Sequence, residues 1–270
     1  MLLSRLWLNR AKHLFYRGFT NKQFLTANCE KYDLKFNFFI KDGVGKDIYY
    51  KYGVYSEDHI TNYLLNTIGI RNEDFIVDIG ANIGWHSMTL SSSAAPTVFS
   101  FEPDPFNFNL LSQNKEINNK TNVKLFNVAL SNENGKKTLY LYKDHNLGRH
   151  SLIQQQKSVR STEVTTVRLD NLLEKEGMDQ RRIKLIKIDV EGFEYMAMLG
   201  AKESLKRTDY LLTEFTPGMM RKIDQDPKDY IDLLREAGFK IQTIDQNGLH
   251  TPDFDHILDN NQQVDFFCSR

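Results

Sequence analysis

The sequence predicts an α/β fold built on a mostly parallel sheet. Residues 75–79 form a short apolar run that breaks at a glycine-rich turn, and a second apolar run at 98–101 ends on Glu102. The stretch that begins at Trp85 indicates a helix between them, so the three form one strand–turn–helix–strand unit. Further strand-like runs follow at 123–126, 183–188 and 210–213. Strands that alternate with helices in this way are typical of a doubly wound sheet.

Residues 1–22 are basic: they contain five lysines and arginines and no acidic residue. Their apolar side chains can share one side of a helix. We expect this helix to pack on the domain or on a second copy in a homodimer. A peripheral membrane contact, with the helix on anionic lipid, stays open as the other interpretation. The apolar run is too short for a secretory signal.

Residues 1–70 as a whole are predicted to form a cover of helix and hairpin over the cleft of a main domain at 71–270. Residues 32–40 alternate apolar and polar side chains. After a glycine-containing turn, the stretch at 48–50 is expected to return as the partner strand of a hairpin. Residues 57–68 carry apolar side chains at helical spacing, which predicts a helix.

The main domain is expected to continue with helices and strands in alternation after the first unit. One helix is predicted from Pro103 to about residue 118 and another over 227–237. Between them, the segment after the fourth strand is predicted to lead into a helix that ends near Gly200. Asp170, in the sequence LDNLL, is expected to cap the helix that follows it. The remaining strands are predicted at 138–142, 164–167, 239–244 and 264–268.

Composition limits the classes of function. The chain has 270 residues and a formal net charge of zero, which suits one α/β domain with additions. Neutral charge and the lack of an aromatic-and-basic motif argue against a nucleic-acid partner. Cys29 and Cys268 lie far apart, which favours free thiols in a reducing cytoplasm over a disulfide. No apolar run approaches the roughly 20 residues that span a bilayer.

The turn after residues 75–79 indicates the ligand. Gly80 and Gly84 let the backbone approach a ligand, and the next helix offers unpaired N–H groups. A dinucleotide-binding turn would read G-x-G-x-x-G, whereas here Asp78 and Asn82 place polar side chains in the turn. Glu102, at the end of the second strand, can accept both hydroxyls of a ribose. This combination suits a nucleoside that carries a cation and an amino acid, which is S-adenosylmethionine.

Five motifs carry a resemblance to a known family. They are VDIGANIGWHS (77–87), FEPDP (101–105), NVAL (127–130), LDNLL (169–173) and IKIDVEGFE (186–194). In this order they resemble the S-adenosylmethionine-dependent methyltransferases of the FkbM type. The resemblance implies a Rossmann-like class I methyltransferase fold, with a mostly parallel seven-stranded sheet whose last strand, at 264–268, is antiparallel.

The predicted cofactor-binding residues come from the turn and from the resemblance. Asp78 either binds the cofactor or holds the turn, and Glu102 either grips the ribose or caps a helix. The resemblance implies adenine contacts for Asn127 and Ala129, although Asn127 is also suited to capping a turn. The full set is Asp78, Gly80, Asn82, Gly84, Glu102, Pro103, Asn127, Ala129 and Asp189.

Carboxylates that end the strand at 183–188 are the main catalytic candidates. Methyl transfer to an alcohol needs an aligned acceptor oxygen and removal of its proton. Asp189 and Glu191 would face the same side of an extended chain, as a base with an assisting carboxylate or as two ligands of Mg²⁺. Lys187 suits a substrate contact or a buried ion pair. Lone histidines are further candidates for the base: His86, His145 and His150.

The acceptor is expected to bind beneath the polar, irregular segment at 143–162, which is typical of a lid, with disorder as the alternative. The resemblance implies a similar insertion with a small-residue–Ser–Leu core, here at 150–152. It also places Tyr55 and Glu57 near the methionine end of the cofactor, where a surface turn is the other interpretation. The candidate substrate residues are Tyr55, His150, Ser151 and Glu214.

Together these features predict an S-adenosylmethionine-dependent O-methyltransferase that acts on a hydroxyl of a sugar, glycan or glycoconjugate. The acceptor class is implied by the resemblance. One alternative enzyme would methylate an amine, amide or carboxylate of a small molecule. The alternative outside enzymes is a scaffold that keeps the fold without catalysis and recruits partners or membrane through residues 1–22.

Overall fold

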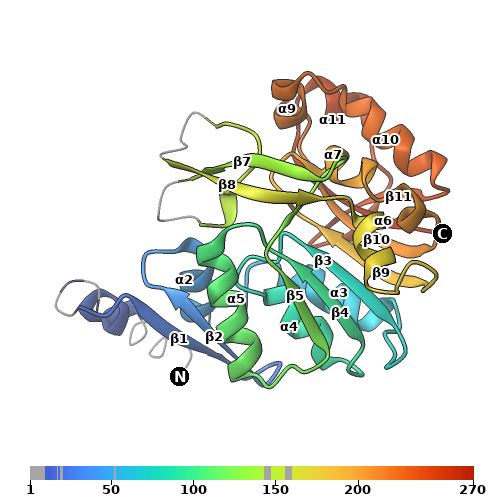
Figure 1. Cartoon of the computed structure of the whole chain (residues 1–270). Coiled ribbons are helices and arrows are strands. Elements are labelled where there is room, and N and C mark those ends of the chain that lie inside the picture. The colour runs from blue at the N-terminus through green and yellow to red at the C-terminus, as the bar shows by residue number, and fades with distance from the viewer. Residues whose placement is uncertain (1–9, 17, 19–20, 52, 143–146, 156–159) are drawn as a thin grey trace.

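The computed structural model describes residues 10–16, 18, 21–51, 53–142, 147–155 and 160–270. At its centre lies an eight-stranded sheet (Figure 1). Its strands are β3 (Phe75–Ile79), β4 (Thr97–Phe101), β5 (Val123–Phe126), β9 (Ile183–Ile188), β10 (Thr208–Phe215), β11 (Lys240–Asp245), β12 (Gly248–His250) and β13 (Val264–Ser269).

The order of these strands confirms the Rossmann-like prediction. Across the sheet they run β12-β11-β13-β10-β9-β3-β4-β5. The pairs among β5, β4, β3, β9 and β10 are parallel, and β13 is antiparallel to both its neighbours. The predicted count of seven strands is one short, because the turn at Asn247 returns β12 against β11. The chain moves outward from β3 and then returns to β9, so the switch point where such sheets bind ligands lies between these two strands.

Helices cover both faces of the sheet. One buried cluster joins Ile76 to residues of α3 (Asp58–Thr67), α4 (Trp85–Ser92) and α5 (Pro105–Ile117). The other joins Val77 and Ile79 to the second face. Its helices are α6 (Leu169–Lys175), α7 (Glu194–Leu199), α8 (Lys202–Lys206), α10 (Pro227–Glu236) and α11 (Phe254–Asp259). The alternation of side chains along β3 therefore divides the core into two layers.

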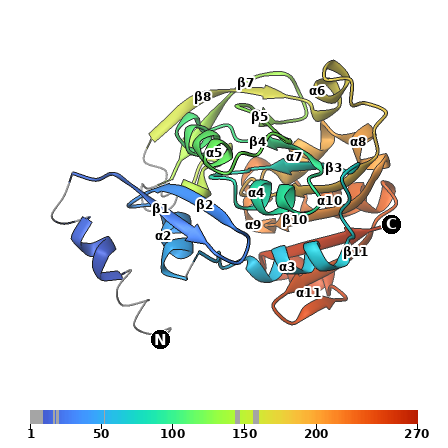
Figure 2. The same cartoon turned by 90° about the horizontal axis from the view of Figure 1, so that it is seen from below.

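The N-terminal cover differs from the prediction in its pairing. The hairpin joins β1 (Phe24–Cys29) to β2 (Leu34–Phe39), and residues 48–50 belong to α2 (Gly43–Tyr50). The predicted return strand is therefore wrong. Asp42 caps α2 by accepting a hydrogen bond from the Gly45 N–H (2.9 Å), which starts a helix where a turn was expected. Figure 2 shows the hairpin and α2 side by side at one end of the molecule.

The basic N-terminal segment is described only in part. Residues 10–16 are helical, and His13 is buried. The His13 ring donates to the Ile40 carbonyl (2.7 Å) and accepts from the Tyr50 hydroxyl (2.7 Å). Residues 10–16 therefore pack on later residues of the cover, which agrees with one of the two predicted alternatives. The membrane contact, the homodimer and the boundary at residue 70 stay predictions.

A second, three-stranded sheet stands at the carboxyl end of the central strands. It consists of β6 (Ala129–Leu130), β7 (Gly135–Leu141) and β8 (Arg160–Val167). Residues 147–155, part of the predicted lid, begin with the short helix η1 (Leu147–Arg149). The Leu147 N–H donates to Asp42 (3.0 Å), which fixes this end of the segment to the cover. His145 lies outside the described residues.

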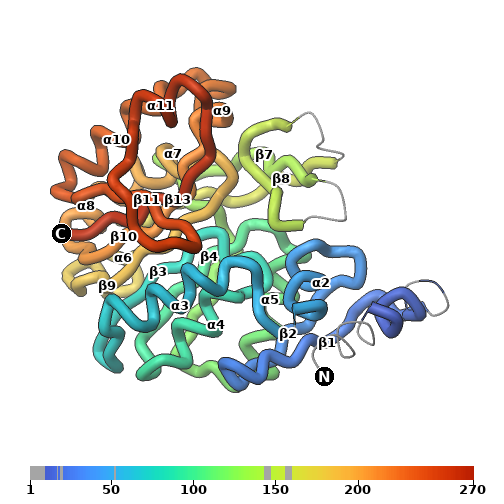
Figure 3. Tube along the Cα trace, turned by 180° about the vertical axis from the view of Figure 1, so that it is seen from behind, coloured from blue at the N-terminus to red at the C-terminus, as the bar shows by residue number. Residues whose placement is uncertain are grey.

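The remaining short elements lie in the C-terminal part. They are α9 (Pro217–Met220) and η2 (Arg221–Ile223). Seen from behind, α9 to α11 lie at the opposite end of the molecule from the β1–β2 hairpin (Figure 3). Both cysteines are buried and free. Among the described residues, every helix is too short or too polar to cross a bilayer.

Candidate functional site

A cavity of about 270 Å³ lies at the carboxyl ends of β3, β4, β9 and β10. We call two of its sides the turn wall and the acidic wall. The turn wall consists of residues 80–83 with Glu102 and Pro103. The acidic wall consists of Glu57, Lys187, Asp189, Glu191 and Glu214. The predicted substrate residues Tyr55, His150 and Ser151 also line the cavity, as do His86 and Ala129.

Gly80 fixes the shape of the turn wall. Its N–H and that of Ala81 donate to the Phe101 carbonyl at 3.0 and 2.9 Å, which ties the turn to β4. The φ of Gly80 is +76°, and a Cβ there would stand 1.9 Å from the Asp189 carbonyl oxygen. Glycine is therefore required for this close approach. Gly84, with φ +95°, starts α4 and lies against Leu111, outside the cavity lining.

Glu102 lies at the end of β4 and is 5% exposed. Its carboxylate accepts hydrogen bonds from the Asn82 N–H (2.8 Å) and the Asp104 N–H (2.9 Å). Burial raises the pKa of Glu102 to about 8. Each oxygen retains acceptor capacity toward the cavity, as a ribose hydroxyl requires. The helix-cap alternative belongs to Asp104, which accepts from the Phe106 N–H (3.3 Å) at the start of α5.

Besides Gly84, two predicted cofactor residues lie outside the cavity lining. Asp78 is fully buried and accepts a hydrogen bond from the Ser87 hydroxyl (2.5 Å), so it holds the turn against α4. The Asn127 amide donates to the carbonyls of Glu102 (2.8 Å) and Pro103 (3.0 Å). Both side chains therefore make contacts of the structural kind that was the alternative to cofactor binding.

Three polar side chains of the cavity carry buried atoms without a hydrogen-bond partner among the described residues. These atoms are Oδ1 of Asn82, Nε2 of His86 and Oδ1 of Asn107. Burial, followed by the charge of Lys187, lowers the pKa of His86 well below its ordinary value, so its ring is neutral. Unpaired buried polar atoms are costly. That all three belong to residues lining one cavity favours a polar ligand there.

Lys187 anchors the acidic wall. Its Nζ lies 3.5 Å from an Asp189 oxygen and 4.0 Å from an Asp78 oxygen, and the residue is buried. Burial works to lower the pKa of Lys187, but the charges of Asp189, Asp78 and Glu57 outweigh it and raise the pKa. The structure thus realises the buried ion pair, one of the two roles predicted for this lysine.

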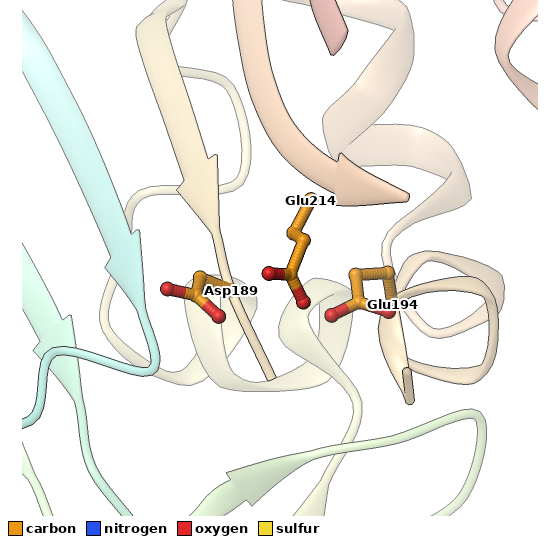
Figure 4. Close-up of side chains that lie close together, drawn as sticks. All are labelled: Asp189, Glu194 and Glu214. Carbon is orange, nitrogen blue, oxygen red and sulfur yellow. The ribbon is translucent and has the colours of Figure 1, made fainter. Parts of the chain in front are cut away.

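Glu191 does not continue an extended chain after Asp189, so the geometry from which the pairing was predicted is wrong, although both residues line the cavity. The strand ends at Ile188, and Glu191 adopts φ +55°, which turns its side chain toward Arg149 (3.7 Å). The group of potential metal ligands is instead Asp189, Glu194 and Glu214, whose carboxyl groups face one another (Figure 4). Glu194 was absent from the predicted site. The signal available in the sequence was its position two residues after Gly192, which follows the strand at 183–188.

Three glutamates of this wall resist ionisation. Burial, followed by the charge of Asp189, raises the pKa of Glu57 to about 7, of Glu191 to about 8 and of Glu214 to about 10. Glu57, which the resemblance placed near the methionine end, is therefore a group that exchanges a proton near neutral pH.

The lid residues have structural contacts in the described part. His150 accepts from the Tyr142 N–H (3.0 Å), and the Ser151 hydroxyl donates to the Glu191 carbonyl (2.9 Å). Asp170 has a structural role, although for another helix than predicted. It accepts from the N–H groups of Glu203 (3.1 Å) and Ser204 (2.9 Å) and so caps α8.

The chain can be aligned with solved methyltransferase structures. The M. jannaschii protein TYW2 in complex with AdoMet is 12% identical, with a TM-score of 0.47 over 93% of this chain and 89% of that chain. A putative methyltransferase from Streptococcus mutans in complex with SAH is 11% identical, with a TM-score of 0.45 over 78% of this chain and 96% of that one. Likeness at this level says nothing about the site.

Relatives are found by sequence as well. The hexuronic acid methyltransferase AglP of Haloferax volcanii is 29% identical over 165 residues, which are 61% of this chain and 63% of AglP. Methyltransferase sdnD of Sordaria araneosa is 31% identical over 178 residues, which are 65% of this chain and 60% of sdnD. The chain thus spans about three fifths of the length of these curated relatives.

The sequence model of the family described as "Methyltransferase FkbM domain" matches residues 78–241. This range covers more than half of the chain and includes the turn wall, Glu102 and the segment from Asp189 to Glu194. The family that the motifs predicted is confirmed: the chain belongs to the FkbM methyltransferases.

Proposed function

We propose that this S-adenosylmethionine-dependent methyltransferase methylates an oxygen of a sugar, glycan or glycoconjugate. The observation that carries the proposal is the cavity at the switch point, with Glu102 on one side and a set of carboxylates on the other. S-adenosylmethionine would supply an electrophilic methyl group on a positively charged sulfur. Glu102 would accept the ribose hydroxyls, and the closely approaching backbone at Gly80 leaves space for the nucleoside.

The chain's residues fit that cofactor in three respects. The tight turn at Gly80, where a Cβ would collide with the Asp189 carbonyl, borders the cavity. Asn82 and Asn107 of the lining carry unpartnered polar atoms, and the carboxyl groups of the acidic wall can face a cationic ligand. A dinucleotide would instead bring a negatively charged pyrophosphate toward this wall. Carboxyl groups that can release their protons as a cation approaches therefore support a sulfonium donor.

The acidic wall also supports an oxygen acceptor. An alcohol must lose its proton as it attacks the methyl group, and a positioned carboxylate can accept that proton. We assign this role to Asp189, which lines the cavity beside Lys187. Glu57 lines the same wall and, with a pKa of about 7, can relay the proton to solvent.

A sugar as acceptor is supported by the relative AglP, a hexuronic acid methyltransferase. A hexuronic acid offers both hydroxyl and carboxylate oxygens, so the proposal includes ether and ester formation. Arg149 lines the cavity beside Glu191 and supplies a cationic group that can contact an acidic sugar.

The test separates donor binding from methyl transfer. Calorimetry with S-adenosylhomocysteine should give saturable binding, and Glu102→Ala should weaken it roughly 10- to 100-fold because two hydrogen bonds to a charged group are lost. Labelled S-adenosylmethionine with a host glycan extract should give a labelled sugar. Asp189→Ala should reduce turnover by about 10²- to 10⁴-fold.

The exposed variant Glu163→Ala serves as the control and should match the wild type in both assays. Absence of heat with either donor or product would favour the scaffold alternative. Full turnover in Asp189→Ala would remove this residue from the mechanism, and label on a nitrogen would favour the N-methyltransferase alternative.

A further inference from the structure

Three carboxyl groups converge beside the cavity from three different elements. Asp189 follows β9, Glu194 starts α7, and Glu214 lies near the end of β10 (Figure 4). One oxygen from each lies within 4.8 Å of the others, and among the described residues this is a group with the spacing of metal ligands. Like charges so close repel each other unless a cation or protons neutralise them.

Glu194 gives the second, independent observation. The residue is 0% exposed, and one carboxylate oxygen accepts from the N–H groups of Val190 (3.0 Å) and Gly192 (3.1 Å). The other oxygen, Oε2, is buried and has no hydrogen-bond partner in the described part of the chain. Figure 4 shows this carboxyl group directed toward Glu214. An orphaned carboxylate oxygen aimed into a cluster of acids points to a missing positive partner.

The described cations do not fill this role. Lys187 Nζ lies 3.5 Å from Asp189, and Arg149 Nε lies 3.7 Å from Glu191. Glu214 accepts hydrogen bonds from the neutral side chains of Thr216 and Gln263.

The spacing fits a hard divalent cation. Oxygen ligands of Ca²⁺ lie about 2.4 Å from the ion, so ligands on opposite sides are about 4.8 Å apart, and for Mg²⁺ the corresponding span is about 4.2 Å. The oxygens of the cluster lie within 4.8 Å of one another. A small inward movement of the two partly exposed members, Asp189 and Glu214, would close the site around the smaller ion.

We propose that Asp189, Glu194 and Glu214 bind one divalent cation of the Mg²⁺, Mn²⁺ or Ca²⁺ class. Asp189 and Glu214 line the cavity, whereas Glu194 does not. The ion would therefore be held from behind by Glu194 and direct its remaining coordination positions into the cavity. This site differs from the Asp189–Glu191 pair predicted from the sequence. It is independent of which acceptor the enzyme methylates. Each residue offers the ion one oxygen, so the second Asp189 oxygen stays available to accept the proton of the acceptor.

The experiment uses Mn²⁺ as the probe. The full chain, freed of metal by a chelator, is titrated with MnCl₂ up to about 1 mM, and bound Mn²⁺ is followed by electron paramagnetic resonance. We expect one saturable site in the wild type. Glu194→Gln keeps a carbonyl acceptor for the N–H groups of Val190 and Gly192 but removes the charge. It should weaken Mn²⁺ binding by at least about tenfold.

Two controls make the result decisive. Glu163→Gln removes an exposed acid far from the cluster in the structure and should bind Mn²⁺ as the wild type does. S-adenosylhomocysteine binding by Glu194→Gln, measured without metal, should be unchanged, which shows that the variant is folded. If it is lost, Glu214→Gln takes its place, with the same tenfold loss of Mn²⁺ affinity expected.

Lack of saturable Mn²⁺ binding by folded wild-type protein would overturn the proposal, as would binding that both Glu194→Gln and Glu214→Gln retain in full. Neither result would affect the proposed methyl transfer, which is judged by donor binding and by the labelled product. The two proposals can therefore fail separately.

Discussion

The turn wall and the acidic wall of the cavity are built by different means. The turn wall comes mainly from consecutive residues, and backbone N–H groups of Gly80, Ala81 and Asn82 hold it together. The acidic wall draws Glu57, Asp189 and Glu214 from separate elements around the buried Lys187. Hydrogen bonds hold the backbone of the first wall, whereas the second gathers buried carboxyl groups whose pKa values are raised. The unfavourable burial of ionisable groups is therefore concentrated in the acidic wall, to which we assign the chemistry.

Removal of Lys187 should cause the largest loss of unfolding free energy. Lys187→Met keeps the length of the side chain but leaves Asp78 buried without its cation. Breaking a buried pair on one side costs about 3–5 kcal/mol of the free energy of unfolding. Urea denaturation measures this loss. As control, Lys136→Met breaks an exposed pair with Glu163 and should leave the midpoint unchanged.

A small effect of Lys187→Met, equal to that of Lys136→Met, would contradict the comparison. It would mean that the carboxyl groups of the acidic wall take up protons without loss of stability. The same denaturation repeated at lower pH sharpens the result, because protonated neighbours no longer need the lysine. The difference between Lys187→Met and wild type should shrink there.

A substitution at Gly80, where the turn wall meets the Asp189 carbonyl of the acidic wall, should have the next largest effect on stability. Gly80 and Gly69 both have positive φ, but a Cβ at Gly69 would meet no atom within 4 Å, whereas one at Gly80 would meet the Asp189 carbonyl. Gly69→Ala should cost about 1–2 kcal/mol of unfolding free energy through backbone strain alone. Gly80→Ala should cost about 1–3 kcal/mol more, because the turn must move.

Calorimetry with S-adenosylhomocysteine extends this prediction to the site. Gly80→Ala should weaken binding, since its turn moves away from β9, and Gly69→Ala should bind as the wild type does. Equal stability of the two variants would show that the turn adapts without strain, and the distinction between a rigid turn wall and a charged opposite wall would then be lost.

The same contrast explains how much the sequence could predict. The fold, the turn and Glu102 were predictable because each depends on local patterns: an apolar run, glycines that allow positive φ, and an acid that ends a strand. The position of Glu191 was not, because its left-handed backbone conformation interrupts the extended chain on which the prediction depended. Glu194 was missed for the same reason, since only the turn before it brings it to Glu214.

The cover shows a second limit of local patterns. Residues 48–50 are apolar and aromatic and fit a strand as well as a helix. The capping hydrogen bond from the Gly45 N–H to Asp42 decides the matter, and Asp42 is held in place by Leu147, about a hundred residues away in sequence. Partners of this kind are set by tertiary contacts, which a pattern along the chain does not contain.

The smallest predicted effect is a pH dependence of stability that arises in the acidic wall. Burial and Asp189 raise the pKa of Glu214 from 4.5 to about 10. Between these values the folded chain holds a proton that the unfolded chain has released. Stability should therefore fall as the pH rises through this window. In chelator-containing buffer, the melting temperature should drop by a few degrees between about pH 7 and about pH 9.

Glu214→Gln carries no titrating proton at this position, so its melting temperature should fall less over the same range. Asp245→Asn is the matched control: this exposed acid pairs with His250, and the variant should keep the full slope of the wild type. The effect belongs to the acidic wall only if the melting temperature of Glu214→Gln depends less on pH than that of the wild type. A slope that Glu214→Gln leaves unchanged would place its origin elsewhere and would make the charge difference between the walls smaller than their geometry implies.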